Sequence, residues 1–147
     1  MLFPGAGHWH TFSIGACPTL DFIQIHISFR APGDAPQPQN IPVLSLAGAG
    51  MLSQASGTLR KVAISLWDLP RVTTVNNRRM LRLPALAFDK VLISDRFPVL
   101  EEVRVGVIPD WGLREQCRYE WGQVVAGVQK ALPGLHSRGL LKVSWNP

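Results

Sequence analysis

The stretch that decides the fold is PTLDFIQIHISF, residues 18–29, in which a turn leads into an alternating strand. Large apolar residues occupy every second position: Ile23, Ile25, Ile27 and Phe29. The positions between them are polar: Gln24, His26 and Ser28. Because successive side chains of a strand point to opposite faces, one face of this strand is expected to be buried and the other open.

The same frame of turn residue, leucine and alternating strand recurs along the chain. Its further copies are GTLRKVAI (57–64), PVLEEVRV (98–105) and PGL (133–135), the last leading through extra residues into LKVSW (141–145). We predict strands at 22–29, 61–66, 102–107 and 140–145. Their first inward residues are Ile23, Val62, Val103 and Leu141, so successive copies are 39, 41 and 38 residues apart. A near-constant period of this length is typical of repeat architectures.

The intervals between the strands are long enough for the crossover connections that parallel strands require. The last interval carries one apolar stripe at helical spacing: Leu113, Cys117, Trp121, Val124, Val125, Val128 and Leu132. A shorter helix is predicted over 84–94, with Ala85, Phe88 and Leu92 facing inward. A weak helix is predicted over 43–56, with Leu44, Ala47, Met51 and Leu52 on one face, although Gly48 and Gly50 lower its propensity. Four prolines make 31–42 a predicted loop.

These elements predict a single repeat-type domain over residues 1–147, with about four strand-helix units. The fold class is α/β, a leucine-rich-repeat-like solenoid with a parallel sheet on one side and helices on the other. A compact doubly wound α/β domain is the alternative. The solenoid is favoured because a strand covered on both faces should be continuously apolar, whereas these strands keep Gln24, Lys61 and Arg104 on one side.

Composition sets limits on the class of protein. Charged residues make up 17% of the chain and the net charge is +5, which permits an acidic partner without specifying one. Cys17 and Cys117 have no metal-site spacing, and we expect both to be buried, reduced thiols. The N-terminus lacks the pattern of a secretory signal, and the longest apolar run, 43–52, is too short to span a bilayer. We expect an intracellular protein, cytoplasmic or nuclear, that does not bind membranes.

No motif indicates catalysis or a cofactor. There is no strained nucleophile turn of the GxSxG kind, and Gly48 and Gly50 lack the third glycine of a dinucleotide loop. His8 and His10 have metal-like spacing but no third ligand nearby. Glu101 and Glu102 are adjacent, so they should point apart and lie in solvent at the start of a strand. We therefore expect no enzyme activity, no cofactor and no metal.

Two stretches resemble a specific family. LAFDKVL (86–92) followed by FPVLEEV (97–103), and the ending LPGLHSRGLLKV (132–143), are similar to the late repeats of the large F-box-like protein family of mushroom-forming fungi. The resemblance covers residues 59–143 best. Members of that family carry an N-terminal F-box, which docks on a cullin-type ubiquitin ligase, followed by leucine-rich-like repeats. The resemblance therefore implies that this chain has a leucine-rich-like recognition surface. No segment here matches an F-box, and Ala85 replaces the family's frequent Trp.

The predicted function is that of a non-enzymatic protein-interaction scaffold, as in the substrate-recognition part of an F-box-like adaptor. Strand register places Gln24, Ala63, Arg104 and Lys142 in one row of the open face and His26, Ser65, Gly106 and Ser144 in the next. Six of these are the predicted partner-binding residues: Gln24, His26, Ser65, Arg104, Lys142 and Ser144.

The alternative is a basic nucleic-acid-binding module. It would use four arginines of one exposed loop, which could grip phosphates: Arg71, Arg78, Arg79 and Arg82. No aromatic residue interleaves them, so nucleic acid is not the expected partner.

Overall fold

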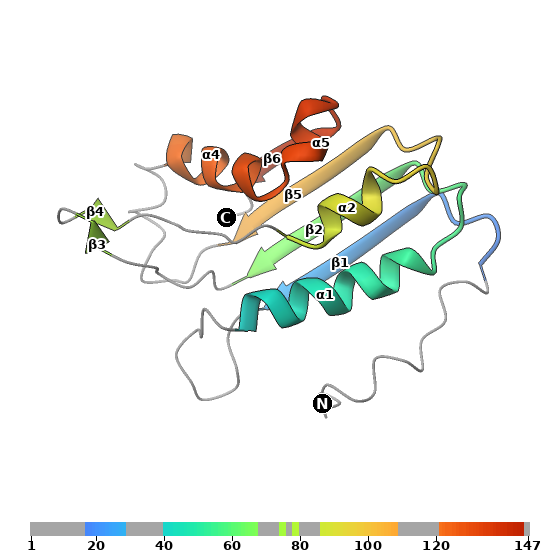
Figure 1. Cartoon of the computed structure of the whole chain (residues 1–147), viewed down its shortest axis with the longest axis horizontal. Coiled ribbons are helices and arrows are strands. Elements are labelled where there is room, and N and C mark those ends of the chain that lie inside the picture. The colour runs from blue at the N-terminus through green and yellow to red at the C-terminus, as the bar shows by residue number, and fades with distance from the viewer. Residues whose placement is uncertain are drawn as a thin grey trace.

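A four-stranded parallel sheet is the centre of the fold in the computed structural model, which describes residues 17–28, 40–67, 74–75, 78–79, 86–108 and 121–145 (Figure 1). Its strands, in spatial as well as chain order, are β1 (Phe22–Ser28), β2 (Lys61–Trp67), β5 (Glu102–Ile108) and β6 (Leu141–Trp145). All neighbouring pairs are parallel. The four predicted strands are thus confirmed to within one residue at each end, and Phe29 lies outside the described residues.

The register of the sheet is also the predicted one. Ile23 pairs with Val62, Val62 with Val103, and Val103 with Leu141. The two predicted open-face rows, which begin at Gln24 and His26, are aligned across all four strands in the same way. Register is strongly specified here because a slip of one residue would turn every inward side chain outward.

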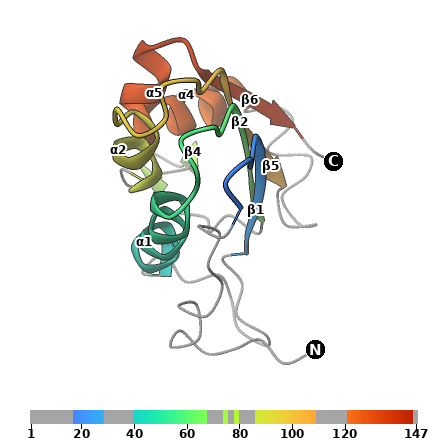
Figure 2. The same cartoon turned by 90° about the vertical axis from the view of Figure 1, so that its right-hand side faces the viewer.

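The helices of the described part all lie against one face of the sheet, as Figure 2 shows. They are α1 (Asn40–Ser53), α2 (Phe88–Leu92), α4 (Trp121–Ala131) and α5 (Pro133–Ser137). α1 packs beside α2, and α2 beside α5. The molecule is therefore a mixed α/β structure in which the sheet is not closed and helices cover one side of it.

One hydrophobic core lies between the sheet and this helix layer. The inward side chains of the two central strands are almost fully buried: Val62, Ile64, Leu66, Val103, Val105 and Val107. The leucine of the repeated turn also enters the core, since Leu59 is 0% and Leu100 is 9% exposed. These two copies of the turn motif therefore close the core where β2 and β5 begin.

The first three units are joined by the same backbone contacts. The amides of Arg60 and Lys61 both donate to the carbonyl of Asp21, and the amides of Glu101 and Glu102 both donate to the carbonyl of Arg60. At these two junctions one carbonyl of the pre-strand turn thus accepts two bonds from the next unit, whereas at the third junction the amide of Val103 donates to the carbonyl of Leu140. The equivalence of the first two junctions supports the predicted repeat at the level of hydrogen bonding.

Side chains of one helix also cap the next. The amide of Ala87, just before α2, donates to Ser45 Oγ of α1 at 2.7 Å. The amides of Gly134 and Leu135, in the first turn of α5, donate to the Asp89 carboxylate of α2 at 2.9 and 2.8 Å. Because a helix start leaves its first amides without partners, these bonds fix neighbouring units against each other.

The helix boundaries differ from the prediction in several places. α1 begins at Asn40, so the predicted loop over 31–42 is wrong at its end, and Pro42 fits because first-turn amides need no helical partner. α2 spans Phe88–Leu92, shorter than the predicted 84–94, and 81–85 lie outside the described residues. Pro133, predicted in a turn, begins α5. The stripe residues of 113–120 are likewise outside the described part, while Val124 and Val128 are buried as predicted.

The buried face of α1 is only partly the one predicted. Leu52 is buried as predicted, together with Ser45, Gly48 and Ala49, whereas Ala47 and Met51 are only half-buried and the side chain of Leu44 lies outside the described residues. The reason is close packing: a Cβ on Gly48 would lie 2.5 Å from Cε1 of Phe88, whose ring is fully buried. The interface between α1 and α2 therefore uses small residues, which a search for large apolar side chains overlooks.

We expect Gly48→Ala to destabilise the protein and Gly50→Ala to stabilise it. Alanine favours a helix over glycine by about 1 kcal/mol at either position, but overpacking against the Phe88 ring costs about 1–3 kcal/mol. Nothing lies within 4 Å of a Cβ on Gly50. Urea unfolding of the two variants measures the opposite signs. Equal stabilisation by both would contradict the packing of α1 on Phe88.

Candidate functional site: the open face of the sheet

The six predicted partner-binding residues are brought together on the sheet face opposite the helices. Gln24, Arg104 and Lys142 share one row, and His26, Ser65 and Ser144 share the next. Four of them are exposed: Gln24, His26, Arg104 and Lys142. Ser144 is half-buried, and Ser65, on a central strand, is only 5% exposed. The predicted surface is therefore one geometric unit, in which Ser65 offers little area to a partner.

Two cations of this face, Arg104 and Lys142, are paired with a carboxylate. Glu102 Oε1 accepts from Arg104 Nη2 at 2.9 Å, and Glu102 Oε2 accepts from Lys142 Nζ. Glu102 is thus a bridging carboxylate that the prediction of a solvated strand start missed. The sequence signal was present, because Glu102 and Arg104 are two apart on one strand and the predicted register sets Lys142 beside them.

This arrangement shifts the titration of the carboxylate. The hydrogen bond from Lys142, with its charge and that of Arg104, holds the pKa of Glu102 below its ordinary value. Desolvation of Glu102 opposes this effect but is outweighed. The charged trio is therefore favoured in its ionised form at neutral pH.

The lowered pKa of Glu102 gives the stability of the protein an acid dependence. A carboxyl whose pKa is lower in the folded state stabilises the fold above its unfolded pKa, near 4.3, and this contribution is lost as pH falls through the folded pKa. We expect Glu102→Gln to be less stable than wild type at pH 7, with the gap closing towards pH 3. Urea unfolding across this range measures the gap. A gap independent of pH would contradict the ion-pair geometry.

An aromatic pair lies near the opposite end of the same face. Trp67 Nε1 donates to His26 Nδ1 at 3.4 Å, and the two rings meet edge to face with centroids 6.3 Å apart. Trp67 remains 40% exposed. It was missed because the predicted second strand ended at residue 66, one position short. Alternation along β2 would have assigned it to the open face with Ala63 and Ser65.

The open face therefore has two chemically different ends. Lys61, Glu102, Arg104 and Lys142 form what we call the charged end, at the start of the strands, and His26 and Trp67 form the aromatic end. Between them the central strands carry small residues: Ala63, Ser65 and Gly106. Small side chains between bulkier ends leave room for a partner to lie close to the backbone.

Two of the four arginines of the alternative hypothesis belong to the described residues. Arg78–Arg79 form the short strand β4, which pairs in antiparallel fashion with β3 (Thr74–Val75). The predicted loop thus contains a small two-stranded ladder. Arg71 and Arg82 lie outside the described residues, so the structure does not show the four arginines together.

The described residues also form a hollow outside the open face. It lies between the turns before β2 and β5, and it is lined by the Arg60–Glu101 ion pair and by Val99 and by none of the residues of the open-face rows.

The predictions on metals, membranes and cysteines concern other parts of the chain. Within the described ranges no group of three metal-binding side chains occurs, and His8 and His10 lie outside them. None of the helices there has the length and apolarity to cross a membrane. Cys17 is exposed in the turn before β1, ahead of the first core residue, so its predicted burial is wrong.

Comparisons with protein-family models, with curated proteins and with solved structures found no significant match to this chain.

Proposed function

We propose that this chain is a protein-interaction scaffold, a leucine-rich-repeat-like solenoid that recognises a partner with the open face of its sheet. The observation that supports it is the one-sided layering: helices cover one face, and polar side chains stand in register on the other. Units that stack in chain order support the solenoid, and so do the turn hydrogen bonds that its first two junctions share. Its setting is intracellular, cytoplasmic or nuclear.

The resemblance to the F-box-like family gives this scaffold a role. The chain would supply the substrate-recognition surface of a ubiquitin-ligase adaptor, with the bound partner as the protein to be modified. No catalytic step is asked of it, because the ligase chemistry belongs to other subunits.

Site-specific photo-crosslinking tests the proposal. A benzophenone amino acid at Gln24 or Lys142, both exposed on the open face, should crosslink a protein in an extract of the source cells. The same group at Lys130, exposed on α4 in the helix layer, should not. Mass spectrometry identifies the crosslinked chain. Equal yields of the same protein from Lys130 would remove the open face as the recognition surface.

The rival function is nucleic-acid binding by the Arg71–Arg82 segment, and the β3–β4 ladder is what favours it, because it fixes the backbone of two of the arginines. Binding of a labelled oligonucleotide should then weaken steeply with added salt and be lost in an Arg78→Ala/Arg79→Ala variant. The scaffold proposal expects neither result.

A further inference from the structure

We infer that the open sheet face binds an extended acidic protein segment in which a carboxylate and a large apolar side chain are four residues apart. This inference rests on the proposed function and adds the chemistry of the partner. It is carried by the charge of one end of the face, the exposed indole at the other, and the distance between them.

The charged end suits a carboxylate. The described open-face side chains there carry three cations and one anion: Lys61, Arg104, Lys142 and Glu102. Glu102 engages both Arg104 and Lys142, yet each cation remains well exposed, at 58% and 63% of its side chain. A guanidinium and an ammonium have five and three donors, so both can bind a second carboxylate while keeping Glu102.

The same balance argues against a polyanion. A nucleic-acid strand brings a phosphate with every nucleotide, and Glu102 sits between the two cations that those phosphates would need. An excess of positive charge that is small and localised fits one or two carboxylates of a protein segment better.

The aromatic end suits an apolar anchor. Trp67 is 40% exposed, and its Nε1–H is already directed at His26, so the ring is oriented before a partner arrives. Tryptophan is enriched among the residues that dominate binding energy, because it buries a large area at low entropic cost.

The spacing follows from the register. Trp67 is aligned with Ile108, four residues beyond Arg104 on the neighbouring strand. At about 3.3 Å per residue the two ends are about 13 Å apart along the strands. An extended segment covers that distance in four residues, and residues at positions i and i+4 point to the same side of it. Ala63, Ser65 and Gly106 leave the path between the ends free of large side chains.

Selection from a displayed library of random 12-residue peptides, with the full chain as bait, tests the inference. Wild type should enrich Asp or Glu four positions from Trp, Phe or Leu. A triple variant, Glu102→Arg with Arg104→Glu and Lys142→Glu, inverts the charges while keeping opposite charges paired. It should enrich Lys or Arg at the position of the acid. Trp67→Ala should lose the apolar preference while keeping the acidic one.

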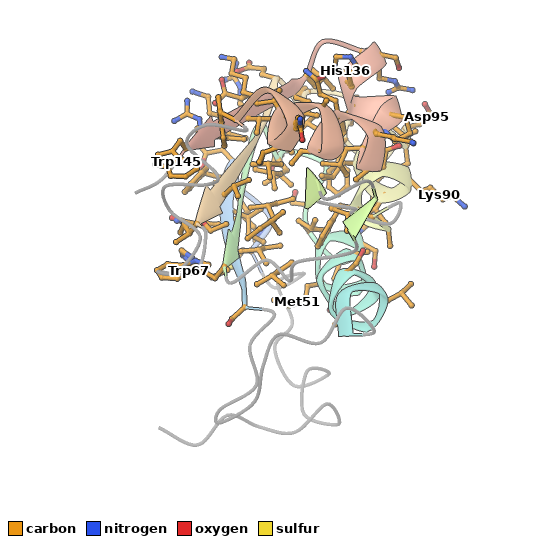
Figure 3. All side chains as sticks on the ribbon, turned by 90° about the vertical axis from the view of Figure 1, so that its left-hand side faces the viewer. Met51, Trp67, Lys90, Asp95, His136 and Trp145 are labelled. Atoms are coloured by element: carbon orange, nitrogen blue, oxygen red, sulfur yellow. The ribbon has the colours of Figure 1, made fainter. Side chains whose placement is uncertain are left out.

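The matched control is Lys90→Glu, which changes the net charge of the protein by the same amount as the triple variant. Lys90 is exposed on α2, and Figure 3 shows it on the opposite side of the molecule from Trp67. It should select the wild-type sequences. In fluorescence anisotropy a wild-type-selected peptide should bind the triple variant about tenfold more weakly, because an attraction and a repulsion of about threefold each multiply. Circular dichroism and melting confirm that each variant is folded.

The outcomes separate the inference from the proposed function. If the selected peptides need Trp67 but show no preference for acidic residues, the inference is overturned. It is also overturned if the triple variant selects the same acidic residues as wild type. In both cases the face remains a recognition surface. Failure of the library to yield any face-dependent peptide overturns the inference, while the crosslinking result decides the proposed function independently. A third outcome is that a 20-nucleotide single strand displaces a selected peptide and that this displacement requires Arg104 and Lys142. That result overturns the inference in favour of nucleic acid as the partner.

Discussion

Replacing Val105 with aspartate is expected to abolish folding at neutral pH. Val105 is 1% exposed in the central strand β5, between Ile64 of β2 and Val143 of β6. A carboxylate buried there without a partner costs several kcal/mol, comparable to the roughly 5–15 kcal/mol stability of a whole domain. Burial raises the pKa of such a carboxyl, so the loss should be smaller at pH 4, where the folded state can keep it protonated.

Far-ultraviolet circular dichroism and urea unfolding measure this effect. Gln24→Asp is the control, because it introduces the same residue into a strand of the same sheet at an exposed open-face position. It should change the free energy of unfolding by less than about 1 kcal/mol. If the Val105→Asp protein has the same free energy of unfolding as wild type, then β5 does not place this residue in the core.

The sheet was predictable because two independent signals agreed. Alternation along each strand assigned its inward face, and the recurring turn motif aligned one strand with the next. Ile23, Val62, Val103 and Leu141 therefore came into register from sequence positions alone. The alternation also predicted the layering of the described part, in which the helices lie on one face, since helices on both faces would leave no place for Arg104 or Lys142.

The helix layer was less predictable because its contacts are made by small and polar residues. Gly48 looks like a helix breaker in the sequence, yet its missing side chain makes room for the Phe88 ring. Ser45 and Asp89 look like surface residues, but they are buried because they accept hydrogen bonds from the next unit. Hydrophobic periodicity carries no information about such bonds.

The candidate site was predicted in position but not in chemistry. Register placed Arg104 beside Lys142, whereas the carboxylate that joins them, Glu102, was assigned to solvent. Together with Glu101, Glu102 was interpreted as the solvated start of a strand. A search for opposite charges two residues apart on one strand, followed across the register, would have found the trio.

Asp89→Ala is expected to lower the free energy of unfolding by about 2–4 kcal/mol. Asp89 is 8% exposed, and its carboxylate accepts hydrogen bonds from the amides of Gly134 and Leu135 at the start of α5. A hydrogen bond to a charged acceptor contributes about 1.5–3 kcal/mol, and alanine would leave the buried amide of Leu135 without a partner. The amide of Gly134 is only partly buried and can bind water instead, so its loss adds less, up to about 1 kcal/mol. Asp89→Asn keeps the shape of the side chain but offers one acceptor oxygen, so it should recover less than half of the lost stability.

The control is Asp95→Ala. Asp95 is exposed in the turn after α2, so this variant should change the free energy of unfolding by less than about 0.5 kcal/mol. If Asp89→Ala proves as stable as Asp95→Ala in urea unfolding, the helices are not linked from unit to unit through this carboxylate.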